Sequence, residues 1–337
     1  MTKDTKQKNS YTVAIIGAGP IGLELAIALQ RAGVDYVQFE AGQIGQTISW
    51  WPRETRFFST TERIEIAGVP IQNPVQQRTT GEEYLAYLRA LVEQFDLQIH
   101  TYERVEKIEA ISAGFRLTTE TKSGENQTLC QKIVFAKGDM DAPNLLHIPG
   151  EDLPHVSHYF TDPHKYFRRR LLIVGGKNSA LETALRCWRA GSRVTISYRR
   201  SEFDPEVVKE HLLPDVLTQI KLGNIGFLPE TRPVEITPEK VVLECADGER
   251  MLFPADFVLL HTGFRADYSL LKMVGVQLIG DQDPNSTPKP WKRTYLAFTW
   301  LGPLQPEHNP IIVCSLRIAM STLGESSPRS QANIPTN

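Results

Sequence analysis

The chain has 337 residues, a formal net charge of −2 and 23% charged residues. A chain of this length can form two domains with full hydrophobic cores. The near-neutral charge gives no reason to expect a nucleic acid or an anionic membrane as partner, and no apolar run in the sequence is long enough to span a bilayer.

The N-terminus and the cysteines indicate the compartment. The first residues, MTKDTKQKNS, are polar and lack the apolar core of a signal peptide. Cys130, Cys187, Cys245 and Cys314 lie far apart, which excludes a C-x-x-C dithiol or zinc knuckle. We therefore expect a protein of the reducing cytoplasm whose cysteines are small buried side chains.

The first predicted elements are a strand, a glycine-rich turn and a helix. Thr12–Ile16 is a short β-branched run that is typical of a strand buried on both faces. Gly17, Gly19 and Gly22 form the pattern G-x-G-x-x-G. The first glycine turns the chain, the second admits a pyrophosphate and the third lets helix and strand pack closely.

A second strand at residues 36–39 ends at Glu40, eighteen positions after Gly22. This is near the expected place of the acid that binds a ribose hydroxyl of a dinucleotide. The carboxylate would repel a 2′-phosphate, so this unit favours FAD or NAD over NADP. Glycines, strands, helix and acid together are far more specific than the glycine pattern alone.

The same order of elements returns in the second half of the chain. Its strand, turn, helix and second strand are Leu171–Val174, Gly175 and Gly176, Asn178–Ala190, and Arg193–Tyr198. Lys177 stands where the second glycine of the pattern is expected and Ala180 replaces the third. The turn alone is therefore a weak match.

The second strand of this unit ends in Arg199 and Arg200 instead of an acid. Two guanidinium groups at the ribose-reading position can clamp a 2′-phosphate, which favours NADPH over the alternative of a solvated basic edge. The predicted cofactor-binding residues are Gly17, Gly19, Pro20, Gly22 and Glu40 for FAD, and Gly175, Gly176, Lys177, Asn178, Ser179, Arg199 and Arg200 for NADPH. One FAD unit and one NADPH unit indicate an oxidoreductase in which hydride passes from nicotinamide to flavin.

Several segments resemble the thioredoxin-reductase-like flavoproteins, namely GAGPIGLELA, VFAKGDMDAPNLLHIPGE, VGGKNSALE and HTGFRAD. More narrowly, FFSTTERIEIAGVPI together with VGGKNSA resembles the bacillithiol disulfide reductase family, over about residues 11–282. The resemblance implies an α/β fold of two Rossmann-like dinucleotide-binding domains (three-layer ββα), with the NADPH domain inserted into the FAD domain. It also implies a homodimer and a small-molecule disulfide, such as bacillithiol disulfide, as substrate.

The resemblance places further residues and sets the domain boundaries. It implies that Gly45 and Gln46 lie near the flavin, Val105 lies near the adenine, and Ala136 and Gly138 mark the crossover into the NADPH domain. The expected divisions are 11–155 for the first part of the FAD domain, 156–252 for the NAD(P)H domain, 253–282 for the second part of the FAD domain, and 283–337 for an aberrant tail.

The sequence departs from the resemblance at the redox thiol. HVSHYFTDPHKYFRRR, just before the second unit, has no cysteine where thioredoxin reductases carry C-x-x-C. Ile21 stands where the narrower family often has a cysteine, and it can carry no thiolate. The catalytic residues are therefore unknown. Two alternatives stay open: a ferredoxin-type NADPH reductase without a dithiol, and a flavin monooxygenase, although Pro154 stands where the latter pattern expects a histidine after Gly150.

Two clusters of side chains have alternative interpretations. His155, His158 and His164 share one loop, and we expect a solvated interdomain loop there and no metal site. Trp50 and Trp51 follow the turn expected near the flavin, where they would wall the isoalloxazine or pack in the core.

The last part of the sequence breaks the expected pattern of a closing strand and helix. Eight of the 22 prolines fall there, at Pro284, Pro288, Pro290, Pro303, Pro306, Pro310, Pro328 and Pro335. Proline removes ladder donors and stops helices, so a disordered tail is expected. Codons can be chosen for this segment so that the reading frame starting at each codon's third base encodes residues typical of the family. Our hypothesis is therefore that the sequence from about residue 283 onward is the product of a frameshift. We then expect the chain to hold FAD weakly and to be poorly active.

Overall fold

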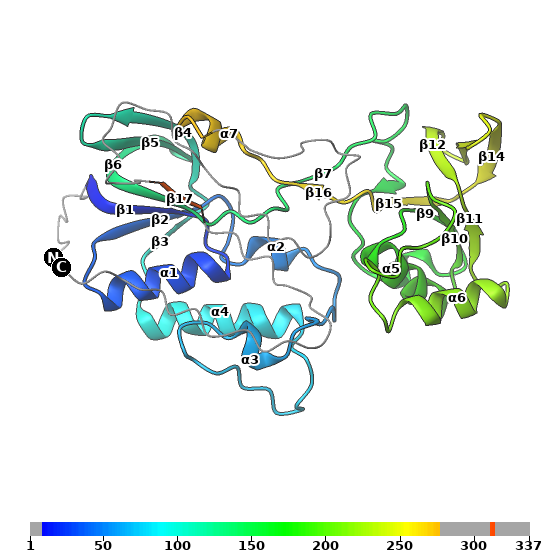
Figure 1. Ribbon diagram of the computed structural model, residues 1–337, viewed down its shortest axis with the longest axis horizontal. Coiled ribbons are helices and arrows are strands. Elements are labelled where there is room, and N and C mark those ends of the chain that lie inside the picture. The colour runs from blue at the N-terminus through cyan, green and yellow to red at the C-terminus, as the bar shows by residue number, and fades with distance from the viewer. Residues whose placement is uncertain (1–8, 277–310, 314–337) are drawn as a thin grey trace.

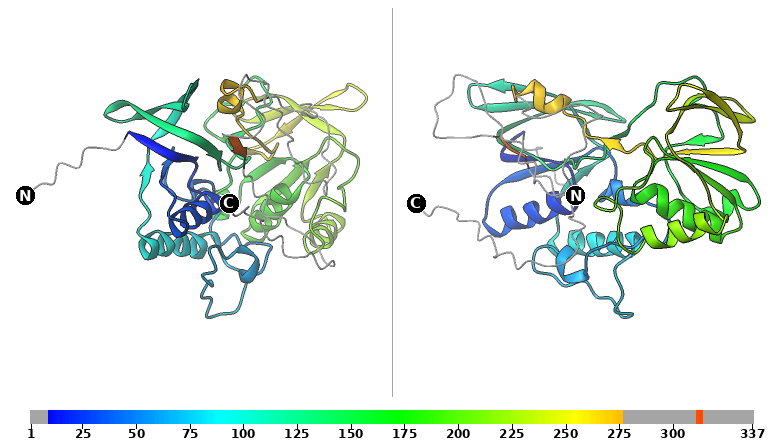
Figure 2. Two further views of the ribbon diagram at one scale, coloured as in Figure 1. Left: turned by 60° about the vertical axis from the view of Figure 1, so that its left-hand side comes forward. Right: turned by 45° about the vertical axis from the view of Figure 1, so that its right-hand side comes forward.

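The computed structural model describes residues 9–276 and 311–313. Two large sheets, each with its own helices, are joined by a two-stranded ribbon of β7 (Ala142–Pro143) and β16 (Phe264–Arg265) (Figure 1). Figure 2 shows the same two units from two further sides. The predicted α/β class with two Rossmann-like units is confirmed.

The first unit is a seven-stranded sheet in the order β3-β2-β1-β6-β5-β4, with β17 on β6. Its strands are β1 (Ser10–Ile16), β2 (Tyr36–Glu40), β3 (Ile99–Thr101), β4 (Arg104–Ile111), β5 (Gly114–Thr121), β6 (Gly124–Phe135) and β17 (Ile311–Val313). Its helices are α1 (Pro20–Arg31), α2 (Gln46–Ser49), α3 (Thr61–Ile64), α4 (Gly81–Phe95) and α7 (Ser269–Met273). The strands β1, β2, β3 and β17 run parallel, whereas β4 and β5 form antiparallel pairs that end on β6.

These elements make three layers. Helices α1 and α4 lie on one face of the parallel strands, and the long hairpins of β4, β5 and β6 cover the other face (Figure 1). Side chains alternate along a strand, so Val13 and Ile15 of β1 pack toward the helices while Ala14 and Ile16 pack toward the hairpins. The parallel layer is therefore buried on both faces, as the β-branched run predicted.

The second unit is a five-stranded parallel sheet in the order β11-β10-β9-β15-β8. Its strands are β8 (Val156–Ser157), β9 (Arg170–Val174), β10 (Arg193–Ser197), β11 (Gly226–Leu228) and β15 (Phe257–Leu260). The helices α5 (Asn178–Arg189) and α6 (Leu213–Lys221) lie on one face, and the antiparallel sheet of β12 (Thr231–Ile236), β13 (Lys240–Cys245) and β14 (Arg250–Pro254) lies on the other (Figure 1). A short 3-10 helix, Pro163–Tyr166, precedes β9.

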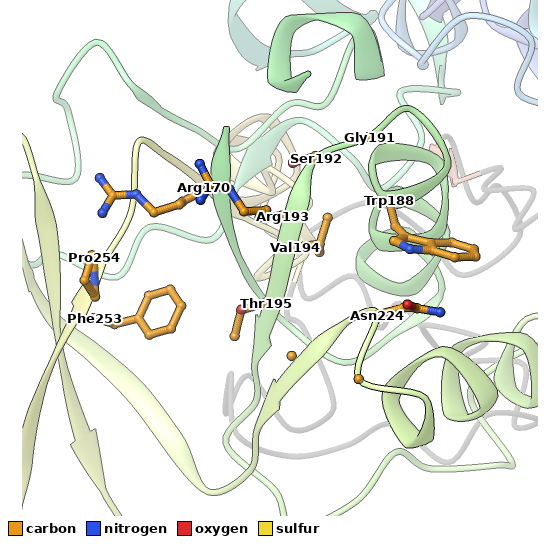
Figure 3. Close-up of a pocket in the computed structure, with 12 residues that line it drawn as sticks. Arg170, Trp188, Gly191, Ser192, Arg193, Val194, Thr195, Asn224, Phe253 and Pro254 are labelled. Carbon is orange, nitrogen blue, oxygen red and sulfur yellow. The ribbon is translucent and has the colours of Figure 1, made fainter. Parts of the chain in front are cut away.

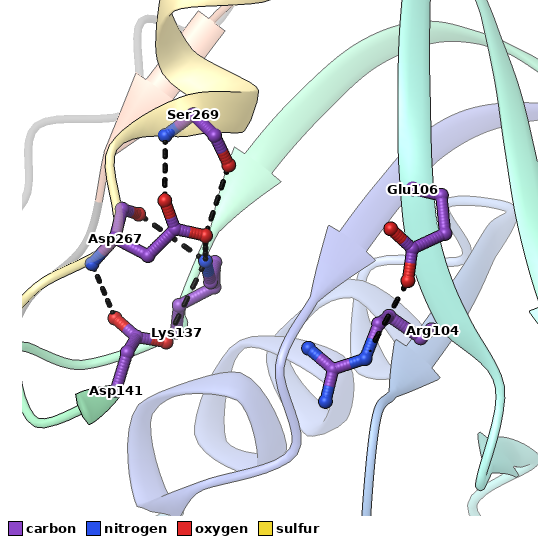
Figure 4. Close-up of polar contacts among 6 residues, drawn as sticks. All are labelled: Arg104, Glu106, Lys137, Asp141, Asp267 and Ser269. Atoms are coloured by element: carbon purple, nitrogen blue, oxygen red, sulfur yellow. Dashed lines mark hydrogen bonds and ion pairs between the residues drawn. The ribbon is translucent and has the colours of Figure 1, made fainter.

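The ribbon fixes how the two sheets meet. The carboxyl end of β6 leads into β7, and that of β15 leads into β16, so the carboxyl edges of both parallel sheets border the ribbon. Lys137 Nζ lies 3.5 Å from Asp141 Oδ1 and 3.4 Å from Asp267 Oδ2, and the Asp267 amide donates to Asp141 Oδ2 at 2.8 Å (Figure 4). These charge-assisted bonds tie the outgoing and returning strands together.

Strand β15 corrects one predicted boundary. We expected the NAD(P)H domain to end at residue 252, but Phe257–Leu260 pairs with β9 and completes the second sheet. Val258 and Leu260 are buried there beside Leu172 and Val174. The physical reason is that a continuous apolar strand suits either sheet, and only tertiary pairing decides between them.

Strand β17 corrects part of the prediction for the tail. Residues 311–313 were expected to be disordered, but they pair in parallel with β6, Ile311 being in register with Ile133. Three β-branched residues favour a strand, and the β6 edge offers unpaired backbone groups to it. The rest of the predicted tail, residues 283–310 and 314–337, lies outside the described residues. The expected loss of the closing helix and the weak retention of FAD therefore stay predictions.

The core of the first unit can be tested at Leu117, which is fully buried in β5. Leu117→Ala should lower the free energy of unfolding by about 2–5 kcal/mol, because it removes apolar contacts and leaves a cavity. The matched control, Leu252→Ala, lies on an exposed face of β14 with 59% of the residue accessible. It should change the free energy by less than about 0.5 kcal/mol. Urea unfolding measures both, and equal effects would contradict this core.

Candidate dinucleotide-binding sites

The first glycine turn requires glycine at two of its three glycine positions. Gly17 has a φ of +114°, and a Cβ added to it would lie 2.5 Å from the carbonyl oxygen of Ala136. A Cβ on Gly22 would overlap the Gly17 carbonyl oxygen. A Cβ on Gly19, by contrast, would meet no protein atom within 4 Å. The middle glycine therefore faces open space, where a pyrophosphate fits.

Helix α1 begins at this turn without a side-chain cap. Gly19 is the N-cap residue, and Pro20, which has no amide hydrogen, is the first helical residue. The amide groups of the first turn of a helix have no intrahelical partners, and they attract anions. The arrangement fits the phosphates of FAD at the start of α1.

Glu40 lies against this turn, where the sequence predicted a ribose-binding acid. Its Oε2 accepts from the Ala18 amide at 2.8 Å and its Oε1 accepts from the Gly42 amide at 2.9 Å. The Gly45 amide donates to the Ala18 carbonyl at 3.0 Å. The turn, the acid and the start of α2 are thus one hydrogen-bonded unit.

The other residues predicted near FAD border the same edge of the sheet. Gly45 is the left-handed N-cap of α2 with a φ of +66°, and Gln46 begins that helix. Val105 is buried two residues past Glu103, whose amide donates to the Glu40 carbonyl at 3.0 Å. Their cofactor contacts stay predictions.

Ala136 and Gly138 follow β6 directly. The Ala136 amide donates to the Ile16 carbonyl at 2.8 Å, and Gly138 has a φ of +76°. Together with the Gly17 contact, these bonds place the predicted crossover at the carboxyl edge of the first sheet.

Sequence reasoning missed Gln38, a fully buried polar residue within β2. Its Nε2 donates to the Gly17 carbonyl at 2.9 Å, and its Oε1 is buried without a partner among the described residues. The bond fixes the first glycine turn to strand β2. The available signal was an amide between two buried apolar residues, Val37 and Phe39.

The second glycine turn repeats the geometry of the first. Gly175 has a φ of +141°, and a Cβ on it would lie 2.5 Å from the carbonyl oxygen of His261. A Cβ on Gly176 would lie 2.5 Å from the ring of Tyr198. Lys177 is exposed and precedes α5 in extended conformation, without a side-chain cap.

The side chain of Asn178 is engaged within the protein. Its Nδ2 donates to the Val207 carbonyl at 3.1 Å, and its Oδ1 accepts from the Lys209 amide at 2.8 Å. Both side-chain atoms therefore hold the segment after β10 instead of pointing at a phosphate. A contact with NADPH is left to the backbone amide of Asn178, and the exposed Ser179 follows in the same turn.

The two arginines lie at the carboxyl end of β10, as predicted. Arg199 is exposed, and Arg200 Nη1 lies 3.3 Å from Asp204 Oδ2. Such a partly exposed ion pair is worth little, so the pair leaves the arginine able to turn toward a phosphate.

The three histidines of the interdomain loop have separate surroundings. His155 Nε2 lies 3.1 Å from the Thr237 carbonyl, His158 Nε2 lies 3.2 Å from Glu151 Oε1, and His164 is exposed. No group of histidine, cysteine and acidic side chains that could hold a metal occurs in residues 9–276.

His261, which the sequence did not single out, lies beneath Gly175. Burial first, and then the neighbouring His158, lower the pKa of its imidazole to about 4. Its Nε2 and the Nδ1 of His158 are buried without partners among the described residues. His261 is therefore neutral at neutral pH.

The two units touch beside the ribbon. Trp50 packs against Tyr159 and Phe264, with ring centroids 5.2 and 5.0 Å apart. Arg186 of α5 donates to Thr55 Oγ1 at 3.3 Å across the units. Trp51, by contrast, packs within the first core, 4.9 Å from Phe57.

Neither of the two buried cysteines in the described part of the chain is poised as a thiolate. Burial raises the pKa of Cys130 and of Cys187 to about 12. Cys245 is half-buried in β13, and Cys314 lies outside the described residues. The two buried cysteines are thus the small apolar side chains that we expected.

A shallow depression of about 700 Å³ lies elsewhere on the second unit (Figure 3). It is lined at the amino ends of the strands, by Arg170 of β9, Arg193 of β10 and Gly226 of β11, among others. Ligands of open parallel sheets bind at the carboxyl ends. The depression is therefore on the wrong edge to be the dinucleotide site.

Comparisons with known proteins agree with this geometry. The family described as pyridine nucleotide-disulphide oxidoreductase matches residues 14–294. The bacilliredoxin reductase Bdr of Bacillus subtilis is 32% identical over 78% of this chain and 80% of its own length. A ferredoxin–NADP reductase of Ignicoccus hospitalis is 27% identical over 80% of this chain and 82% of its own. The solved bacillithiol disulfide reductase Bdr (YpdA) from Bacillus cereus is 32% identical, with a TM-score of 0.79 over 90% of each chain.

No helix within residues 9–276 is both long enough and apolar enough to span a membrane.

The first turn can be tested at Gly19. Gly19→Ala should leave the stability of the FAD-free protein unchanged, because the added methyl group meets no protein atom within 4 Å and the backbone is extended there. The affinity for FAD should fall roughly tenfold or more, because a methyl group then occupies the path of the pyrophosphate. Flavin fluorescence quenching measures the affinity, and unchanged binding would exclude this turn as the FAD site.

The buried imidazole predicts a pH dependence of stability. The folded-state pKa of His261 lies below its ordinary value of 6.5, at about 4. Its contribution is therefore fully present above pH 6.5 and is lost as the pH falls toward 4. Between pH 7 and pH 5 the free energy of unfolding should therefore fall by about 2 kcal/mol because of His261. Urea unfolding at pH 7 and at pH 5 should show a smaller loss of stability for His261→Asn than for the wild type. An identical loss in the two proteins would contradict the burial of the imidazole.

Proposed function

Because this chain belongs to the pyridine nucleotide-disulphide oxidoreductase family, we propose that it uses NADPH to reduce a low-molecular-weight disulfide, with bacillithiol disulfide as the first candidate. The protein is an oxidoreductase that uses FAD and NAD(P)H. The observation that carries the proposal is the pair of glycine turns, Gly17–Gly22 and Gly175–Gly176, at carboxyl edges that border one ribbon.

The two nucleotides have different places in this proposal. FAD is held by Gly17, Gly19, Pro20, Gly22, Glu40, Gly45, Gln46, Val105, Ala136 and Gly138, and NADPH by Gly175, Gly176, Lys177, Asn178, Ser179, Arg199 and Arg200. Glu40 disfavours a 2′-phosphate in the first unit by charge repulsion, whereas Arg199 and Arg200 favour it in the second. The proposed NADPH domain reaches to the end of β15, at Leu260.

The overall reaction is NADPH plus a disulfide plus a proton, giving NADP⁺ and two thiols. Bound FAD supplies the step that accepts a hydride and releases two electrons. The residues of the chain orient both nucleotides. The backbone amides at the starts of α1 and α5 receive the phosphates, and the Trp50–Tyr159–Phe264 cluster holds the two units together beside the ribbon.

The two buried cysteines cannot serve as thiolates in the disulfide-reducing half of the reaction. Cys130 and Cys187 are buried with raised pKa values, and apolar Ile21 packs against the first core. We therefore propose that the disulfide is reduced directly at the flavin. We place the reaction in a reducing cytoplasm and the enzyme in a homodimer.

A ferredoxin is the second candidate acceptor. The raised pKa values of Cys130 and Cys187 favour it, because transfer of single electrons to an iron–sulfur protein needs no dithiol. The relative from Ignicoccus hospitalis, named as a ferredoxin–NADP reductase, adds to this alternative.

The acceptor can be identified by anaerobic stopped-flow reoxidation of the full chain, loaded with excess FAD and reduced by NADPH. Bacillithiol disulfide, other small disulfides, oxidised ferredoxin and oxygen are each mixed in separately. We expect the disulfide to restore the flavin absorbance at least roughly tenfold faster than ferredoxin or oxygen, a barrier difference of about 1.4 kcal/mol. Rapid reoxidation by ferredoxin alone would overturn the disulfide proposal.

The choice of NADPH can be tested at the two arginines. The double substitution of Arg199→Ala and Arg200→Ala removes the charge-assisted bonds to a 2′-phosphate, each worth about 1.5–3 kcal/mol. The KM for NADPH should rise at least roughly tenfold, while that for NADH changes little. Arg193→Ala, at the amino end of β10, is the matched control. An unchanged preference would contradict the assignment.

A further inference from the structure

The two units place equivalent residues beneath their glycine turns. Ala136 is the first residue after β6, and its amide donates to Ile16 of β1 at 2.8 Å. His261 is the first residue after β15, and its amide donates to Val174 of β9 at 2.8 Å. Each carbonyl faces the first glycine of its turn. His261 is therefore the positional counterpart of Ala136, with an imidazole in place of a methyl group.

His158 lies beside His261 at the same edge. In the pairing of β8 with β15, Ser157 is in register with Leu259, so His158 and His261 follow at adjoining strand ends. The side chain of His158 is only 11% exposed, and Glu151 Oε1 lies 3.2 Å from its Nε2. Glu151 itself accepts from the Leu146 and His147 amides, each at 2.7 Å. A fixed carboxylate thus orients the His158 ring.

The contact with Glu151 engages Nε2 of His158 and leaves Nδ1 to other partners. Nδ1 of His158 and Nε2 of His261 are both buried without a hydrogen-bond partner among the described residues. A buried polar atom without a hydrogen bond is unfavourable, so two such atoms at one strand edge point to a polar ligand.

The strand order identifies which half of the dinucleotide lies there. The turn after β9 stands between β10, which ends in the arginines, and β15 with β8, which end in the histidines. In such sheets the dinucleotide crosses the edge at this point, with the adenosine half on the arginine side. The nicotinamide half then lies over β15 and β8.

We propose that His158 and His261 hold the nicotinamide half of NADPH through hydrogen bonds to its ribose hydroxyls and carboxamide. A hydroxyl or an amide can both donate and accept, so it can pair with an imidazole nitrogen whether or not that nitrogen carries a hydrogen. A phosphate, which only accepts, matches the cationic arginines at the other end. Both histidines are positioning residues, because they fix the nicotinamide and do not exchange electrons or protons with it.

The test separates the two halves of the ligand. This inference rests on the NADPH site of the proposed function, so binding is measured and not turnover. Isothermal titration of the full, FAD-loaded chain compares NADP⁺ with 2′,5′-ADP, which contains the adenosine half alone. His261→Ala, which copies Ala136, should weaken NADP⁺ about tenfold, the equivalent of one hydrogen bond. The affinity for 2′,5′-ADP should stay within about twofold.

Two further variants guard against damage to the fold. His261→Asn keeps a donor and an acceptor, and it should restore most of the NADP⁺ affinity. His164→Ala, at an exposed histidine before β9, is the matched control and should bind both ligands like the wild type. Unchanged NADP⁺ binding in His261→Ala, or a parallel loss of both ligands in His261→Asn, would overturn the inference.

The failure of the proposed function gives a different result. If the variants show the expected binding pattern but the wild-type protein reduces no disulfide, the disulfide proposal is overturned and the histidine assignment is supported. A wild-type protein that binds neither NADP⁺ nor 2′,5′-ADP would overturn both the NADPH site and the histidine assignment.

Discussion

The close approach of a glycine to a neighbouring carbonyl oxygen is the constraint on which both nucleotide sites depend. Gly17 lies against Ala136 and Gly175 lies against His261, each so closely that a Cβ would come within 2.5 Å of the carbonyl oxygen. The contact brings the crossover strand, the first strand and the start of the helix to one point. It thereby leaves the uncapped helix N-terminus at the carboxyl edge, where phosphates bind.

The ribbon converts these two local sites into one reaction centre. Each crossover strand leaves its glycine turn and enters the ribbon within a few residues, so the two turns border the same region. Lys137, Asp141 and Asp267 bind the two chains of the ribbon together through charge-assisted bonds, and the aromatic cluster around Trp50 packs beside them. The fold thus supplies proximity between two nucleotides, and the choice of acceptor depends on the surface around the flavin.

Local chemistry explains what was predictable from the sequence and what was not. The strand–turn–helix units, Glu40, and the arginines after β10 were predicted, because strand runs, glycine spacing and terminal charges are local signals. Gln38 and His261 were missed, since their importance comes from contacts with Gly17 and Gly175 that no spacing announces. Asn178 turned toward residues 207–209, and β15 joined the second sheet, because tertiary pairing outweighs the local pattern.

The central claim is that the two turns hold NADPH and FAD within reach of each other in this chain. It is tested most directly by anaerobic titration of the FAD-loaded, full-length protein with NADPH while the flavin absorbance is followed. The account predicts stoichiometric bleaching of the flavin by NADPH. A flavin that binds tightly but stays oxidised in excess NADPH, with NADPH bound in the second unit, would show that the two sites do not communicate.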